Sequence, residues 1–124
     1  MPDFKQIHAW QRAHALGIAL HKLTSGFVPV GHANLRAKLT RAADSIASTI
    51  AEGCGAATAK EFARFLEMSI KSANDTEYHL LSPRGLGLVS RKDWQKCNAE
   101  TIEIRKMTFG YRKKVLENDA AKLR

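Results

Sequence analysis

The sequence has little that would cross-link it or break its helices: 2 cysteines and 3 prolines in 124 residues. Cys54 and Cys97 show no C-x-x-C spacing and no secretory context, so we expect two reduced thiols. A disulfide or a nucleophilic thiolate is the alternative. No apolar run approaches the ~20 residues that a helix needs to cross a bilayer. The first ten residues lack a basic-then-apolar signal layout, so we expect a cytoplasmic protein with no membrane segment.

Motifs of the common enzyme classes are also missing. The sequence contains no phosphate-binding loop, dinucleotide-binding glycine motif, zinc-protease motif or nucleophile elbow. Di-metal bundles use Glu-x-x-His pairs, whereas Glu77 is followed two positions later by His79 on another helical face. His14 and His21 share a helical face, but no carboxylate or cysteine lies near them in sequence. We therefore expect surface histidines and no catalytic residue, metal or cofactor.

Apolar residues recur at spacings of three and four in four segments, which predicts four amphipathic helices. The expected helices run from about Phe4 to Ser25, from Ala33 to Glu52, from Thr58 to Pro83, and from Ser90 to about Asn118. Alternating β-branched segments are missing, so no sheet is expected. The predicted fold is all-α: one domain, residues 1–124, built as an antiparallel up-down-up-down four-helix bundle.

The segment Thr40–Leu66 predicts the corner between the second and third helices. Gly53 and Gly55 are expected to supply the backbone freedom that a helix C-terminus favours. Thr58 and Glu61 have the spacing of a capping box, which indicates where the third helix begins. Many small residues precede this corner, and they favour tight helix packing over a cofactor groove.

Two carboxylates of this region are expected to need partners. Glu52 lies in the last turn of the second helix, where a negative charge opposes the macrodipole. We expect a compensating salt bridge from Arg41, or from a basic residue of another helix or subunit, in preference to a functional carboxylate. Glu77 lies close to the apolar stripe of the third helix and is expected to pair with another helix.

The net charge of +8 is unevenly distributed along the chain. Residues 1–83 carry nine Lys/Arg against seven Asp/Glu, a net +2, whereas residues 84–124 carry eleven against five, a net +6. Such an excess favours a polyanionic partner, above all nucleic acid. No segment interleaves aromatic and basic residues, so contacts are expected through phosphates rather than bases. The alternative is that the charge serves solubility.

The fourth helix is predicted to be apolar on two faces. Its main seam has seven-residue periodicity and comprises Trp94, Cys97, Thr101, Ile104, Thr108, Tyr111 and Val115. A second stripe, about a hundred degrees away, is expected to form an oligomer interface and consists of Ile102, Phe109 and Leu116. The basic residues on the remaining surface are the candidate nucleic-acid-binding residues: Arg105, Lys106, Arg112, Lys113 and Lys114.

The run RAADSIASTIAEGCGAATAKEFARFLEMSIKSANDTEYHL resembles the 23S rRNA intervening-sequence protein family, also called four-helix bundle proteins. Its motifs are matched by Arg41, Ala42, Ser45 and Ile46, by Ile50, Ala51, Glu52 and Gly53, and by Phe62, Phe65 and Leu66. The chain departs from the family pattern at Ala56-Ala57 and at Ser82-Pro83. We assign a structural role to the motif residues Arg41, Glu52, Gly53, Phe62 and Phe65.

The resemblance implies a cytoplasmic homo-oligomer, often a ring-like homopentamer, with no established enzymatic activity. Proteins that resemble the family in fold include accessory factors of diversity-generating retroelements, which contact a reverse transcriptase and nucleic acid. The expected function is therefore a non-enzymatic oligomeric bundle that binds RNA, DNA or a nucleic-acid-processing partner such as a reverse transcriptase. The alternative is a structural or protein-interaction scaffold with no nucleic-acid role.

Overall fold

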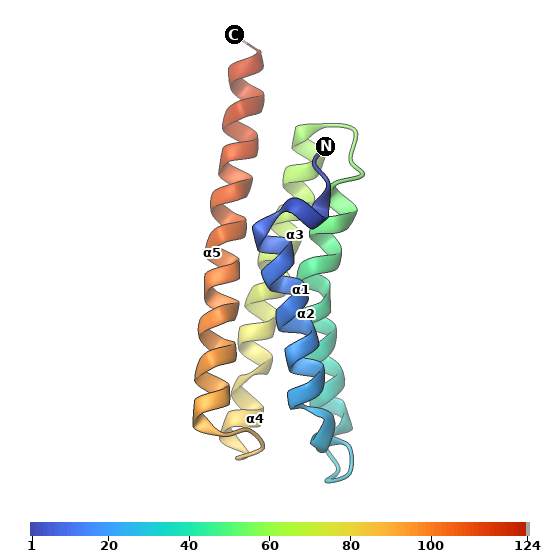
Figure 1. Ribbon diagram of the computed structural model, residues 1–124, viewed down its shortest axis with the longest axis vertical. Helices are drawn as coiled ribbons and strands as arrows, with labels where there is room; N and C mark the ends of the chain where they lie inside the picture. Colours follow the sequence, from blue (N-terminus) through green and yellow to red (C-terminus); the bar gives the residue numbers. More distant parts are fainter. Residues whose placement is uncertain (124) are drawn as a thin grey trace.

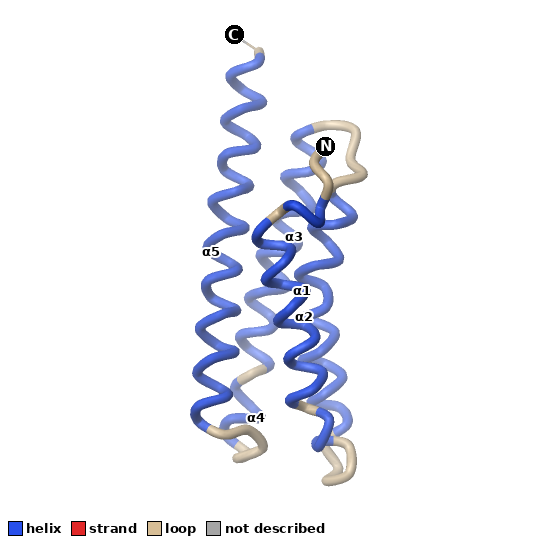
Figure 2. Tube along the Cα trace, in the orientation of Figure 1, coloured by secondary structure: helices blue, strands red, loops and turns tan. Residues whose placement is uncertain are grey.

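Four long helices lie side by side along one axis in the computed structural model, which describes residues 1–123 (Figure 1). They are α1 (His8–Leu23), α2 (Ala33–Gly53), α3 (Ala59–His79) and α5 (Arg91–Lys122), and a short α4 (Leu81–Gly85) precedes α5. Neighbours in sequence are neighbours in space, and α5 closes the bundle against α1. The predicted antiparallel four-helix bundle is thus confirmed. The trace of these residues contains only helices and loops (Figure 2).

The helix limits differ from the predicted ones at both ends of the chain. A separate 3₁₀ turn, Phe4–Gln6, precedes α1, because the Asp3 side chain accepts a hydrogen bond from the Lys5 amide at 3.0 Å. At the other end, α5 continues past Asn118 to Lys122 and projects beyond the other helices (Figure 1). None of the helices within residues 1–123 is long and apolar enough to span a membrane.

Pro83 does not end the third helix directly, as predicted, but lies buried inside α4. A proline ring clashes with the carbonyl four residues earlier and offers it no N–H, so α3 ends at that residue, His79. As the third residue of α4, Pro83 lies where a backbone N–H has no intrahelical acceptor, so its missing N–H costs no hydrogen bond. The break leaves Leu81 52% exposed.

The apolar stripes of the four long helices meet in the core. Its fully buried aliphatic and aromatic side chains include Leu20, Leu39, Ile46, Ile50, Phe62, Leu66 and Ile104. Buried hydroxyl groups line the same core, and each threonine among them donates to the carbonyl four residues earlier at 2.7–2.8 Å: Thr24, Thr40, Thr49, Thr76, Thr101 and Thr108. The hydroxyl groups of these buried threonines therefore all have hydrogen-bond partners, as buried polar groups require.

The corner between α2 and α3 depends on a close approach at Gly53. A Cβ atom placed on Gly53 would lie 2.7 Å from Phe65 Cβ and 2.9 Å from Phe62 Cδ1. Neither Gly53 nor Gly55 has a positive φ, so the expected role in backbone freedom is wrong. Gly53 is required because the aromatic side chains of α3 pack directly against its backbone.

The predicted cap of α3 is confirmed. Thr58 is the N-cap, and its Oγ1 accepts the Glu61 amide at 3.1 Å. The Glu61 carboxylate reaches back to the Ala57 amide at 3.3 Å, one residue before the cap. The short corner between α2 and α3 is therefore fixed at both of its ends, by packing at Gly53 and by hydrogen bonds at Thr58.

Gly53→Ala is expected to lower the free energy of unfolding by about 2 kcal/mol, because the added methyl group overpacks the corner. Gly110→Ala is the matched control, since a Cβ there meets no atom within 4 Å and alanine favours the interior of a helix. That variant should gain about 0.5–1 kcal/mol. Urea denaturation followed by circular dichroism measures both. Equal effects of the two substitutions would contradict the packing role of Gly53.

Candidate nucleic-acid interface

Two ion pairs join α3 to α5 and occupy two of the candidate nucleic-acid-binding residues. Arg105 Nη1 lies 2.6 Å from Glu77 Oε1, which confirms that Glu77 pairs with another helix. Arg112 donates from Nε to the Ala63 carbonyl at 3.0 Å, and its Nη2 lies 3.7 Å from Glu67 Oε2. Both guanidinium groups are thus turned toward α3 and hold the two helices in register.

The other three candidate nucleic-acid-binding residues of α5 project from two different sides of the helix. Lys106 and Lys113 are exposed and seven residues apart, so they project from nearly the same side of α5. Lys114 is also exposed, but it follows Arg112 by two residues, about 160° around the helix. Since Arg112 faces α3, Lys114 points away from α3 and does not share a surface with Lys106 and Lys113.

A second basic column lies on α3 and was missed by the sequence analysis. Lys60, Arg64 and Lys71 are exposed and, at 100° per residue, project within about 40° of one another. Glu67 lies within the same column, and its contact with Arg112 shows that this side of α3 borders α5. The column could have been predicted from the sequence, because Arg64 follows Lys60 by four residues and Lys71 follows Arg64 by seven.

Five exposed cations lie on the outer sides of the neighbouring helices α3 and α5, and we call the surface that they define the α3–α5 face: Lys60, Arg64, Lys71, Lys106 and Lys113. The arginines that pair with Glu67 and Glu77 lie at its centre and contribute little net charge. Helices in contact are about 8–10 Å apart, so the two basic columns are close enough to act on one polyanion.

The predicted oligomer stripe lies on the same face as these lysines. Phe109 is 61% exposed, whereas Ile102 and Leu116 are half-buried. A shallow groove of about 500 Å³ runs along this part of α5, lined by Phe109, Arg112, Lys113, Leu116, Glu117 and Ala120. Because Arg112 reaches α3, the groove lies on the α3 side of α5. The oligomer role of the stripe stays a prediction.

Glu52 has no charged partner within residues 1–123. Its side chain is exposed, and Arg41, the expected partner, forms no ion pair with it within 4.0 Å. Exposure to water limits the cost of its unfavourable position at the end of α2 to some tenths of a kcal/mol.

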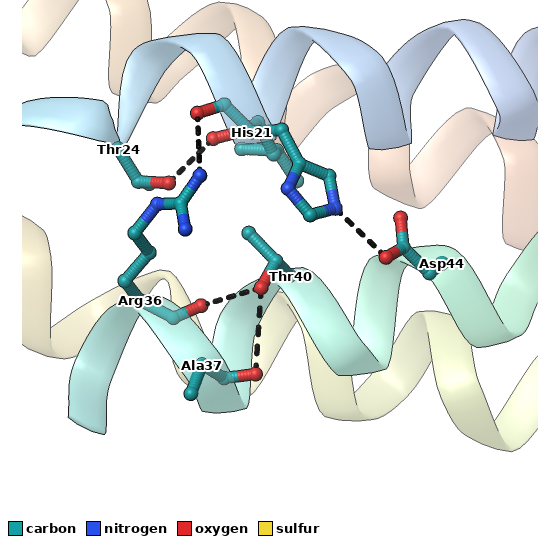
Figure 3. A network of polar contacts seen from close by, with 7 residues as sticks. His21, Thr24, Arg36, Ala37, Thr40 and Asp44 are labelled. Atoms are coloured by element: carbon teal, nitrogen blue, oxygen red, sulfur yellow. Dashed lines mark hydrogen bonds and ion pairs between the residues drawn. The ribbon is translucent and has the colours of Figure 1, made fainter. Parts of the chain in front are cut away.

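The histidines of α1 have separate environments. His21 Nε2 lies 2.8 Å from Asp44 Oδ2 of α2, and Arg36 Nη2 donates to the His21 carbonyl at 3.3 Å (Figure 3). His14 instead stacks on Trp10, with ring centroids 4.9 Å apart. No group of three or more metal-ligating side chains occurs in the part of the chain that the structure describes. The partner Asp44 was missed because it belongs to another helix.

Both cysteines are free thiols with limited access to water. Cys97 is buried in the core and Cys54 is half-buried at the corner after α2. Burial raises the pKa of both thiols, because the thiolate loses hydration. A thiol with a raised pKa is a poor nucleophile at neutral pH, so neither cysteine is arranged for catalysis.

Both thiols are expected to react with a disulfide reagent at pH 8 more slowly than a free thiol, and Cys97 more slowly than Cys54. The raised pKa lowers the thiolate fraction, and burial limits access. Cys54→Ser and Cys97→Ser variants assign the two rates, and unfolding in urea should make them similar. Rapid reaction of Cys97 in the folded protein would contradict its position in the core.

The fold and the charge define the protein as a basic, antiparallel four-helix bundle. The family described as 23S rRNA-intervening sequence protein matches residues 5–110, and the chain belongs to this family. A search of curated proteins gave no match.

A solved structure supports the fold. It is the crystal structure of a protein of unknown function from the S23 ribosomal protein family of Bacteroides thetaiotaomicron. The chain is 22% identical to it, with a TM-score of 0.80 over 85% of this chain and 95% of the other. At this identity the likeness concerns the fold alone.

Proposed function

We propose that this chain is a non-enzymatic helical bundle that binds RNA or DNA through the α3–α5 face. The observation that carries the proposal is the shared surface formed by Lys60, Arg64 and Lys71 of α3 with Lys106 and Lys113 of α5. Cations gathered from two helices in this way match the negative charges of a phosphate backbone.

The ion pairs beneath the face support this function. Arg105 and Arg112 hold α3 and α5 in register, so the exposed lysines project from a rigid surface. Lysine ammonium groups act on phosphates as flexible point charges, without the fixed fork of a guanidinium group. The expected binding is therefore strong at low salt and weakly dependent on base sequence.

The family also supports RNA as one ligand to test. The description of the matching family refers to 23S rRNA, and the structural neighbour is described as an S23 ribosomal protein family member. Structured RNA and duplex DNA are accordingly the first two probes.

Lys106→Glu with Lys113→Glu should weaken binding of both probes at least tenfold and lower the salt dependence. Losing two phosphate contacts should reduce the slope of log K against log salt by about 1.5. The matched control is Lys22→Glu with Lys38→Glu, which makes the same change of charge on α1 and α2. Filter binding or fluorescence anisotropy across a salt series measures all three proteins.

The outcome for the control decides between local contact and overall charge. If both double variants lose affinity equally, the net charge and not the α3–α5 face drives binding. Failure of the wild-type protein to bind either probe at low salt would rule out phosphate contacts altogether.

A second candidate function is a self-associating or protein-binding scaffold. The observation in its favour is Phe109, whose side chain is 61% exposed beside the half-buried Ile102 and Leu116. A homopentamer, as the family resemblance implies, would cover this stripe with a second copy of the chain. A nucleic-acid-processing protein, such as a reverse transcriptase, is the heterologous alternative.

Ile102→Glu and Phe109→Glu should each lower the molar mass measured by light scattering if the stripe joins copies, because each places a charge in an apolar contact. Leu86→Glu is a control at an exposed leucine outside the stripe. A wild-type protein that is monomeric at tens of micromolar would contradict this scaffold role.

A further inference from the structure

Two exposed aromatic rings lie among the cations of the α3–α5 face. Tyr78 is 67% exposed and Phe109 is 61% exposed. Tyr78 follows Lys71 by seven residues, so both project from the same side of α3. Phe109 follows Lys106 by three residues on α5 and precedes Lys113 by four.

The ion pair between Glu77 and Arg105 shows that the two rings lie near each other along the bundle. Tyr78 follows Glu77, and Phe109 lies about one turn beyond Arg105 on α5. Since Glu77 and Arg105 are in contact at 2.6 Å, the rings flank the same junction of the two helices. Residues 31 positions apart in the sequence thus supply aromatic groups to one basic surface.

We propose that the α3–α5 face binds single-stranded nucleic acid, with bases stacked on Phe109 and Tyr78 and phosphates against the neighbouring lysines. This inference rests on the proposed function and narrows its ligand. Unpaired bases expose their faces for stacking, whereas a duplex hides them. Aromatic platforms within positively charged surfaces are the common means of binding single strands without sequence preference.

Charge complementarity favours this ligand over a second copy of the chain. A protein surface packed on Phe109 would also cover Lys106 and Lys113, and burying these two ammonium groups is costly unless each one meets a carboxylate. A nucleic-acid strand supplies an apolar base face and a charged phosphate in each nucleotide. Tyr78 fits the same ligand, because its hydroxyl group can remain hydrated at the edge of a stacked base.

Leucine substitutions separate stacking from apolar contact. Phe109→Leu and Tyr78→Leu remove the aromatic faces but keep apolar side chains. Met68→Leu is the matched control on α3, because Met68 is exposed to 45% but carries no aromatic ring. It lies about 100° around the helix from Glu67. The probes are an oligouridine of about 12 nucleotides and an RNA duplex of the same length.

Fluorescence anisotropy is expected to show about tenfold weaker binding of the oligouridine for each aromatic variant. The affinity of the aromatic variants for the duplex should change less than about twofold. The affinity of the Met68→Leu protein for the oligouridine should also change less than about twofold. Light scattering should give the same molar mass for Phe109→Leu as for the wild type. A loss confined to the single strand supports stacking on both rings.

Three results would overturn the inference. Equal losses for single strand and duplex would show that the rings act through the shape of the face. Unchanged oligouridine binding in both leucine variants, with losses in Lys106→Glu and Lys113→Glu, would leave phosphate binding intact but exclude stacking. A lower molar mass for Phe109→Leu would assign the ring to self-association.

Discussion

The contact between Gly53 and the aromatic side chains of α3 is the constraint on which the bundle depends. Only a residue without a Cβ allows Phe62 and Phe65 to pack against the end of α2. This contact sets how closely α2 and α3 approach, and α3 in turn carries Glu67 and Glu77, the partners of α5. A steric requirement at one glycine of α2 therefore affects the position of α3, which carries part of the α3–α5 face.

Local patterns predicted the helices well because they depend on nearby residues. Apolar spacing identified all four long helices, and the predicted cap at Thr58 forms its hydrogen bond, as does Ser90 at the start of α5. The predictions that were wrong concern residues whose effect depends on another position in the chain. Pro83 acts four residues upstream at His79, and Gly53 matters through side chains of the next helix.

The candidate site was harder to predict because its parts come from two helices. The excess of charge in residues 84–124 pointed to α5 but hid the column of Lys60, Arg64 and Lys71 in the nearly neutral remainder. Arg105 and Arg112 were predicted to contact nucleic acid, although both bind α3: Arg105 pairs with Glu77, and Arg112 binds the Ala63 carbonyl and Glu67. Phe109 stands between Lys106 and Lys113 in the sequence, but only the fold brings Tyr78 and the lysines of α3 alongside them, so a search along the chain could find only part of the surface.

The buried threonines have a consequence for the order of the core. Their hydroxyl groups bond within their own helices, so these bonds survive if one helix slides along another. Register depends instead on a few bonds between elements, such as Ser69 to the Ile46 carbonyl and Trp94 to the Leu80 carbonyl. Loss of those bonds would give a compact state that keeps its helical circular dichroism while its aromatic signals lose their fixed environment.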